Sequence, residues 1–331
     1  MDGICTLAND RVYDQLMALL NSIDAILGPE TPVCVYPYDD NTAQIAAEID
    51  QRPNVQLYDD QASIQRWDQF VRDVWDAHPT AHQRWSQISS DPYYRVGTHR
   101  RFCAFDGPFD RFLYMDADTL VMAPVKPMFE QLDQSDWVVY DFQYTDPAHV
   151  YDLSSHQLGK LFPPERIQSE IFCSGFYASK KGMFAQDRRE WLLSNLQNGE
   201  AEVLYIMAPD QTVLNYMVMR SQISNYNFAK RLPQSSKTGC CVTSTHFKER
   251  DHILYDNNIR LTYIHYIGVK SRCFTQVCAG DNIDFPYREL FLHYRYLHEP
   301  EKRPKFITKP KPYNQPPGLV KRFFKKLKLT C

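Results

Sequence analysis

The stretch FLYMDADTLV, Phe112–Val121, places two aspartates directly after an apolar run. Residues two apart in an extended chain point to the same side, so Asp116 and Asp118 can converge on one ligand. Two carboxylates this close repel each other unless a cation lies between them or one of them takes a proton. The same pattern also occurs in plain turns. The stretch therefore predicts a buried strand that ends either at a ligand or metal site or at a simple turn.

Composition limits the classes of protein that can carry this stretch. The 331-residue chain is 44% hydrophobic and 14% aromatic, which is ample for a large core. Its formal net charge is −3, so no nucleic-acid partner is expected. Nine scattered cysteines indicate free thiols in a reducing compartment, and the absence of a Cys-x-x-Cys pair argues against zinc. No secretory leader and no run of about 18 apolar residues is found, so a cytoplasmic location is expected.

The first sixty residues alternate between two kinds of pattern. Short apolar runs at 3–7, 32–36 and 55–58 predict strands, and residues 12–27 and 42–49 have the apolar spacing of helices. This order indicates a parallel sheet with helices on its faces. We therefore expect an α/β, Rossmann-like fold with a mixed, mostly parallel central sheet.

The remaining body continues the pattern. Residues 61–105 are helical in pattern; further strands are predicted at 112–115, 137–140, 171–178 and 260–266, and a helix at 210–219. In open sheets of this type, ligands bind beyond the carboxyl ends of the strands. Asp116 and Asp118 follow such an end.

The C-terminal region differs from the body. Residues 1–298 are expected to form one domain, and 299–318 are rich in proline and lysine, as in an extended linker. The end, 319–331, reads LVKRFFKKLKLTC and would form a helix with one apolar and one cationic face. That pattern predicts peripheral contact with an anionic membrane, on its cytoplasmic face, although a helix packed on its own domain would look similar.

Two classes of enzyme use an Asp-x-Asp after an apolar strand. In haloacid-dehalogenase-like phosphatases the motif is Asp-x-Asp-x-Thr, which Asp116, Asp118 and Thr119 match, and Gly280–Asp284 with Lys270 upstream imitates their late acidic motif. That motif normally opens its domain, whereas a long alternating region precedes it here. Nucleotide-sugar glycosyltransferases need such a nucleoside-binding half. A catalytically dead sugar-nucleotide-binding protein is a third, non-enzymatic reading.

Six elements in order resemble glycosyltransferase family 8, the glycogenin and bacterial lipopolysaccharide galactosyltransferase group, which has the A-type glycosyltransferase fold. They are TLANDRVY (6–13), the basic residue Arg100, LYMDADTLV (113–121), FCSGFYAS (172–179), DQTVLN (210–215) and HYIG (265–268). The resemblance covers about residues 3 to 275. It implies a metal-dependent hexosyltransferase that uses a UDP-sugar and retains the anomeric configuration.

The resemblance also implies a metal site. Asp116, Asp118 and His265 would be its ligands, and two carboxylates with one imidazole suit Mn²⁺ better than Mg²⁺. Gly268 would let the backbone approach a donor phosphate closely. Without the other motifs, His265 would be read as an ordinary core histidine.

Further site residues follow from the same resemblance. The positions implied to bind the donor are Leu7, Ala8, Asn9, Tyr13, Arg100, Ala117, Ser174 and Gly175. Tyr13 would stack on the base, and the neighbouring Arg101 is expected to be a solvated helix charge. Asp210 and Gln211 would face the reacting sugar. Cys173 replaces the usual asparagine of the family, which leaves the identity of the sugar open.

The leaving diphosphate needs a counter-charge. Lys270 is the candidate, with Arg272 as the alternative, because the family's lysine would fall on Ser271 and its Pro-Trp pair is absent. The acceptor is expected to be a glycan, a lipid-linked sugar or a protein, and the basic tail agrees with a cell-surface glycan precursor.

Overall fold

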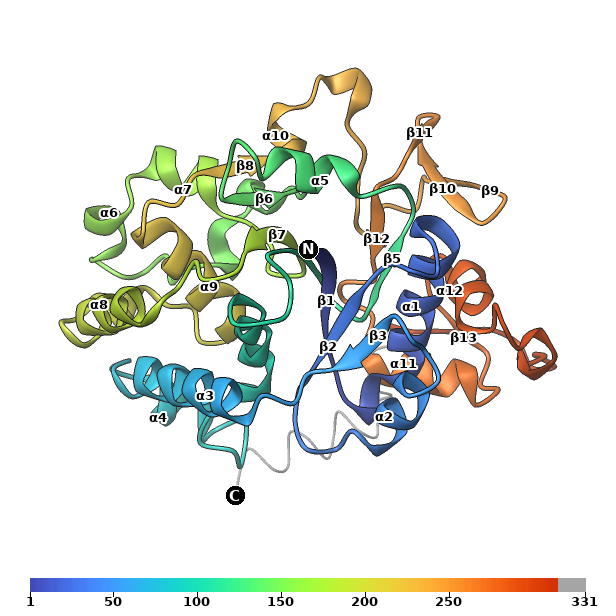
Figure 1. Ribbon diagram of the computed structural model, residues 1–331, viewed down its shortest axis with the longest axis horizontal. Coiled ribbons are helices and arrows are strands. Elements are labelled where there is room, and N and C mark those ends of the chain that lie inside the picture. The colour runs from blue at the N-terminus through green and yellow to red at the C-terminus, as the bar shows by residue number, and fades with distance from the viewer. Residues whose placement is uncertain (315–331) are drawn as a thin grey trace.

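The computed structural model describes residues 1–314 (Figure 1). Its centre is a seven-stranded sheet with the order β3-β2-β1-β4-β7-β6-β8. These strands are β1 (Asp2–Ala8), β2 (Val33–Pro37), β3 (Val55–Leu57), β4 (Arg111–Met115), β6 (Trp137–Val139), β7 (Phe176–Lys180) and β8 (Asn225–Asn227). Only β7 runs antiparallel to its neighbours, β4 and β6, among the pairs of this sheet. The predicted mixed, mostly parallel sheet is confirmed.

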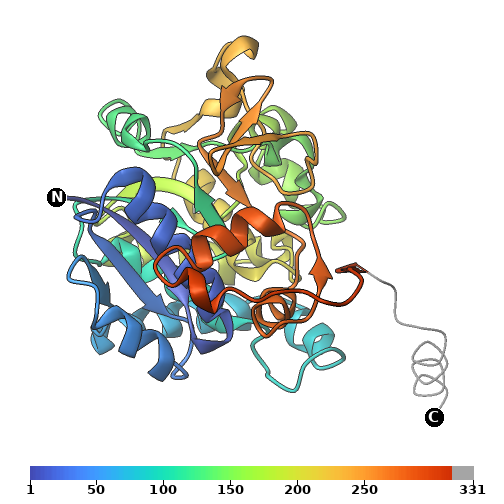
Figure 2. The same cartoon turned by 90° about the vertical axis from the view of Figure 1, so that its right-hand side faces the viewer.

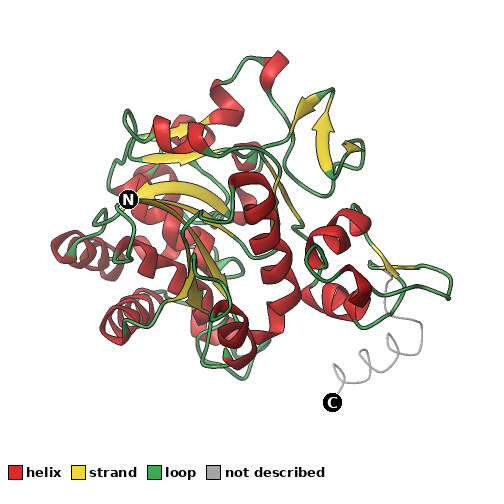
Figure 3. Ribbon diagram, turned by 45° about the vertical axis from the view of Figure 1, so that its right-hand side comes forward, coloured by secondary structure: helices red, strands yellow, loops and turns green. Residues whose placement is uncertain are grey.

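Helices cover both faces of this sheet (Figure 3). Successive strand residues point to opposite faces, so Cys5 and Leu7 of β1 join one core while Ile4 and Ala8 join another. The first core takes side chains from α3 (Gln61–Asp76), α4 (Ala81–Trp85), the 3₁₀ helix η2 (Val96–Phe105), α6 (Leu158–Leu161), α7 (Pro164–Glu170), α8 (Gln186–Gln197) and α9 (Pro209–Arg220). The second takes them from α1 (Tyr13–Leu27), α2 (Ala43–Ile49), α5 (Lys126–Gln131) and α10 (Phe228–Arg231).

A third core joins the late part of the chain to the middle of it. It is built around β5 (Thr119–Val121), β12 (Tyr263–His265), α11 (Ser271–Cys278) and α12 (Arg288–Arg295). A small sheet of β9 (Lys248–Arg250), β10 (Ile253–Asp256) and β11 (Ile259–Arg260) lies beside it. Figure 2 shows α12 lying across α1, against which it packs. This core therefore holds the segment after His265 close to the segment after Asp116.

Residues 299–314 belong to the predicted linker and contact the body. They contain the 3₁₀ turn η7 (Pro300–Lys302) and the strand β14 (Lys311–Pro312), which pairs in parallel with β13 (Ile283–Asp284). Phe306 and Tyr313 pack against the third core. The predicted tail, 319–331, lies outside the described residues. Within residues 1–314, no helix is both long and apolar enough to cross a membrane.

Two predicted strands differ from the observed ones for local reasons. The strand predicted at 171–178 begins only at Phe176, because the backbone of Phe172 pairs with the side chain of Asn215 instead of a neighbouring strand. The strand predicted at 260–266 is divided into β11 and β12. Short 3₁₀ turns complete the connections: η1 (Asp10–Val12), η3 (Gln143–Thr145), η4 (Pro147–His149), η5 (Glu200–Val203) and η6 (Gln234–Ser236).

Candidate active site

The Asp-x-Asp motif forms the turn between β4 and β5. β4 is buried over Phe112–Met115, so Asp116 is the first residue at which the chain leaves the core. The turn is closed by Thr119, whose backbone N and Oγ1 both donate to the carbonyl of Asp116, at 3.0 and 2.7 Å. These two hydrogen bonds within the turn thus fix the direction of both carboxylates.

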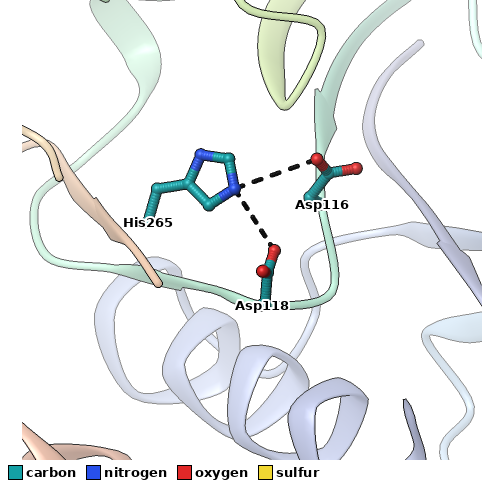
Figure 4. A group of neighbouring side chains, drawn as sticks. All are labelled: Asp116, Asp118 and His265. Carbon is teal, nitrogen blue, oxygen red and sulfur yellow. Dashed lines mark ion pairs between the residues drawn. The ribbon is translucent and has the colours of Figure 1, made fainter. Parts of the chain in front are cut away.

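His265 is aligned with this turn by strand pairing. β12 runs antiparallel to β5 with His265 opposite Thr119, and the backbone N of Tyr266 donates to the carbonyl of Asp118 at 2.9 Å. Figure 4 shows the imidazole facing both carboxylates. Its Nε2 lies 3.3 Å from Oδ1 of Asp118 and 3.9 Å from Oδ2 of Asp116.

The three side chains could hold a metal ion. Their ligand atoms all lie within 4.8 Å of one another. Gly175 borders this cluster, and a Cβ there would lie 2.6 Å from Cε1 of His265 and 2.7 Å from Oδ2 of Asp116. The absence of a side chain at Gly175 therefore keeps the cluster open. Two hard oxygen donors with one imidazole nitrogen fit a divalent cation such as Mn²⁺.

The charges of this cluster are coupled. Burial alone would lower the pKa of His265, but Asp118 and Cys173 together outweigh it and hold this pKa well above its usual value. Burial raises the pKa of Asp116. A cation must bind the neutral imidazole, so metal binding here would displace the proton that His265 otherwise keeps.

Arg101 bridges the metal cluster and a second acidic residue. The residue is 4% exposed, and its guanidinium lies 3.1 Å from Oδ1 of Asp116 and 3.2 Å from Oδ2 of Asp210. It also donates to the carbonyl of Ser174 at 2.8 Å and lies over the ring of Tyr114. The expectation that Arg101 is a solvated charge is wrong. Its burial is tolerated because two carboxylates, a carbonyl and an aromatic face surround it.

Asp210 and Gln211 open α9 beside this arginine. Ser174 donates from its Oγ to Oδ2 of Asp210 at 3.1 Å and from its backbone N to Oε1 of Gln211 at 3.4 Å. Burial would raise the pKa of Asp210, but Arg101, His99, Arg95 and the hydrogen bond from Ser174 together lower it to about 2. Asp210 is therefore ionised at every working pH.

A cavity of about 350 Å³ lies at this edge of the sheet. It is lined by Leu7, Ala8, Asn9, Arg11, Val12, Gln15, Tyr38, Arg95, Thr98, Arg101, Asp116, Ala117, Asp118 and Ser271. The lining comes from the ends of β1, β2 and β4, from η1 and η2, and from the starts of α1 and α11. The cavity thus joins the metal cluster to the alternating N-terminal half.

No family model and no curated protein matches this chain. Among solved structures, it is similar to the galactosyltransferase LgtC in complex with donor and acceptor sugar analogues, at 15% identity and a TM-score of 0.52, covering 88% of this chain and 100% of that one. It is also similar to the apo WbbM bifunctional glycosyltransferase, at 14% identity and a TM-score of 0.54, covering 91% of this chain and 51% of that one. The chain has the A-type glycosyltransferase fold. Identities this low show the fold alone.

Within this fold, some expected donor-binding residues reach the cavity and others do not. Leu7, Ala8, Asn9 and Ala117 line it. Arg100 instead pairs with Asp68 at 3.0 Å. Its predicted contact with the donor stays a prediction.

The aromatic residue that lines the cavity is Tyr38, whereas the sequence pointed to Tyr13. Tyr13 donates to Glu48, and its ring lies under the guanidinium of Arg295. Tyr38 lines the cavity instead, and its place directly after β2 is the sequence signal that could have identified it. Stacking of Tyr13 on a base remains untested.

The loop after His265 ends at the start of α11, whose first residue, Ser271, lines the cavity. Gly268 has a φ of 86°, which favours glycine, and nothing lies within 4 Å of its missing Cβ. Lys270 and Arg272 are both exposed, and neither lines the cavity, whereas Ser271 between them does. The geometry therefore leaves the choice between the two cations open.

Proposed function

We propose that this chain is a metal-dependent, retaining glycosyltransferase that moves a hexose from a UDP-sugar to an acceptor. The observation that carries the proposal is the cluster of Asp116, Asp118 and His265 beside the cavity at the edge of an A-type glycosyltransferase sheet. Ligands of open α/β sheets bind beyond the carboxyl ends of the strands, where this cluster lies.

The metal would be held by one oxygen each of Asp116 and Asp118 and by Nε2 of His265. When bound, the cation would neutralise the donor diphosphate and stabilise it as a leaving group. We propose Mn²⁺, with Mg²⁺ as the second choice, because an imidazole ligand favours the softer ion.

The donor nucleotide would occupy the cavity. Leu7, Ala8 and Asn9 at the end of β1 would contact the nucleoside. Arg11 and Arg95 line the cavity and are exposed, so they can offer positive charge to the diphosphate without losing a buried partner. These charges supplement Lys270 as candidate counter-charges.

Asp210 and Gln211 would face the reacting sugar. Cleavage of the glycosidic bond develops positive charge at the anomeric carbon, and an ionised Asp210 held by Ser174 and Arg101 suits its stabilisation. Gln211 adds a side-chain amide, whose oxygen accepts a hydrogen bond from the backbone N of Ser174.

The acceptor is proposed to be a glycan, a lipid-linked sugar or a protein. The basic, aromatic end of the chain, 319–331, favours an acceptor at the inner face of a membrane, because such a segment binds anionic lipid.

The phosphatase alternative loses its second motif in this arrangement. Asp284 lies on β13 and lines a different cavity, together with Tyr287 and Arg288. Neither Asp284 nor Lys270 is among the residues that line the cavity next to Asp116. A phosphatase would need such an acid and such a cation beside its nucleophilic aspartate.

The two activities give different products. Purified protein should release UDP slowly from its UDP-hexose in the presence of Mn²⁺, even without an acceptor. A panel of UDP-hexoses, read by a coupled UDP assay, would identify the sugar. Release of inorganic phosphate from phosphate esters, with no UDP formed from any donor, would favour the phosphatase instead.

A further inference from the structure

Gln15 is a buried polar residue whose oxygen has nothing to bind. It lies in the first turn of α1, is 2% exposed, and lines the cavity. In the part of the chain that the structure describes, its carboxamide Oε1 has no hydrogen-bond partner. Buried side-chain oxygens are usually paired, so an unpaired one on a residue that lines a cavity needs an explanation.

Packing does not explain this residue. The helix around Gln15 is apolar and buried at Leu16, Met17, Leu19 and Leu20. An apolar side chain at position 15 would continue that surface without leaving an unpaired acceptor. A glutamine here weakens the free protein, which points to a partner that arrives with the ligand.

The other amide of the cavity is already engaged. Asn9 donates from Nδ2 to Asp39 at 2.9 Å and accepts at Oδ1 from the backbone N of Arg11 at 3.1 Å. Of the two side-chain amides that line the cavity, only Gln15 therefore has an unpaired oxygen.

The position of α1 indicates which part of a nucleotide would meet Gln15. α1 packs against β5, directly after the Asp-x-Asp turn, and against α11. Gln15 shares the cavity with Asp118 and Ser271. Between a diphosphate at the metal cluster and a base at the far end of the cavity lies the ribose, whose hydroxyl groups are neutral hydrogen-bond donors.

We propose that Gln15 is a donor-binding residue whose carboxamide forms a hydrogen bond with a ribose hydroxyl of the nucleotide. This assignment rests on the proposed function, because it needs a nucleoside diphosphate in the cavity. It gives Gln15 a part in distinguishing ribonucleotides from deoxyribonucleotides.

The test compares UDP with its 2′-deoxy and 3′-deoxy analogues by calorimetry in Mn²⁺. Wild-type protein should bind UDP about tenfold more tightly than one of the analogues, which corresponds to about 1.4 kcal/mol. Gln15→Met, which keeps the length of the side chain, should bind UDP about tenfold more weakly and lose that preference. Gln15→Leu provides a second variant, and Gln65→Leu, on the exposed face of α3, is the control.

A melting experiment on ligand-free protein separates binding from structure. Gln15→Met should melt at the same temperature as wild type or higher, because it removes an unpaired buried oxygen. Unchanged UDP affinity in Gln15→Met, or an equal loss for UDP and both analogues, would overturn the assignment. If wild-type protein binds no UDP with any divalent cation, the proposed function fails and the assignment fails with it.

Discussion

Arg101 is the residue on which the two halves of the candidate site depend. It pairs with Asp116 of the candidate metal cluster and with Asp210 of the proposed reaction centre while almost fully buried. Removing it would leave two buried carboxylates without their counter-charge, which is costlier than losing an exposed pair.

Arg101→Met should therefore destabilise the protein by roughly 3–5 kcal/mol, as when one partner of a buried ion pair is removed. Arg100→Met is the matched control, because Arg100 pairs with Asp68 nearer the surface and its loss should cost less. Urea unfolding of both variants gives the two values. Equal losses would show that Arg101 is not the bridge described above.

Asp141 gives the protein a stability that depends on pH. It is 3% exposed, and burial raises its pKa to about 7, although the backbone N–H groups of Gln143 and Cys173 oppose the rise. The unfolded chain releases this proton near pH 4, whereas the folded chain keeps it to about pH 7. The stabilising contribution is therefore complete below pH 4 and is lost as the pH rises through 7.

Asp141→Asn should remove the fall in stability that the titration of Asp141 causes as the pH rises. The free energy of unfolding of wild type should fall between pH 5 and pH 8 by about 1–3 kcal/mol more than that of Asp141→Asn. Urea titrations at four pH values measure the difference. Parallel pH profiles for the two proteins would assign the titration to other groups.

At the level of residues, the sequence indicates polar groups that follow apolar strands. Asp116, Asp118 and His265 stand out for this reason, and the structure brings them together. The choice between Arg100 and Arg101 depends on the helix type, which composition does not reveal. In a 3₁₀ helix residues three apart share a face, so Thr98 and Arg101 of η2 both line the cavity.

Among the elements, the pairing of β5 with β12 brings together the candidate metal ligands Asp116, Asp118 and His265. Each strand has three residues, and their register places His265 beside the Asp-x-Asp turn. Gly175, just before β7, lies closer to the side chains of His265 and Asp116 than a residue with a Cβ could.

Gly175→Ala should weaken Mn²⁺ binding by about tenfold or more, since relieving the Cβ contacts with His265 and Asp116 would cost at least about 1–3 kcal/mol. Gly159→Ala, where nothing lies within 4 Å of the new Cβ, is the control. The Mn²⁺ affinity of both variants can be measured by electron paramagnetic resonance, and circular dichroism checks that they fold. A Gly175→Ala variant with wild-type affinity would place the metal elsewhere.

The sequence predicts elements well where apolar periodicity is regular. The strands of the first sixty residues and α1 agree with their predicted positions within a few residues. It predicts them poorly where a side chain replaces a strand partner, as Asn215 does for Phe172. β5 and β12 are too short for a periodicity, and their pairing joins parts of the chain that are far apart in sequence.

The described part of the molecule, residues 1–314, consists of a sheet with two covered faces and a third core that carries His265. Alternation of strands and helices in the first half is sufficient to predict the sheet. The third core, which buries β12 and α12 against α1, has no such local signal because its contacts are long-range. The fold is therefore more predictable than the arrangement of its site.

The proposed membrane contact concerns the chain as a whole. Deletion of residues 319–331 should move the protein from anionic vesicles to the supernatant in a sedimentation assay, because five basic residues at about 1 kcal/mol each are lost. Activity on a water-soluble acceptor should survive. Unchanged sedimentation would show that another surface, or none, contacts the lipid.

The decisive question for the molecule is whether it binds a nucleotide through a metal. UDP should bind wild-type protein in Mn²⁺ but not in chelator, as measured by calorimetry. Asp118→Asn should weaken this binding by at least about tenfold, or about 1.4 kcal/mol, and Asp59→Asn, just after β3 and exposed, should not. UDP binding that persists in chelator, or that survives in Asp118→Asn, would rule out the metal site described here.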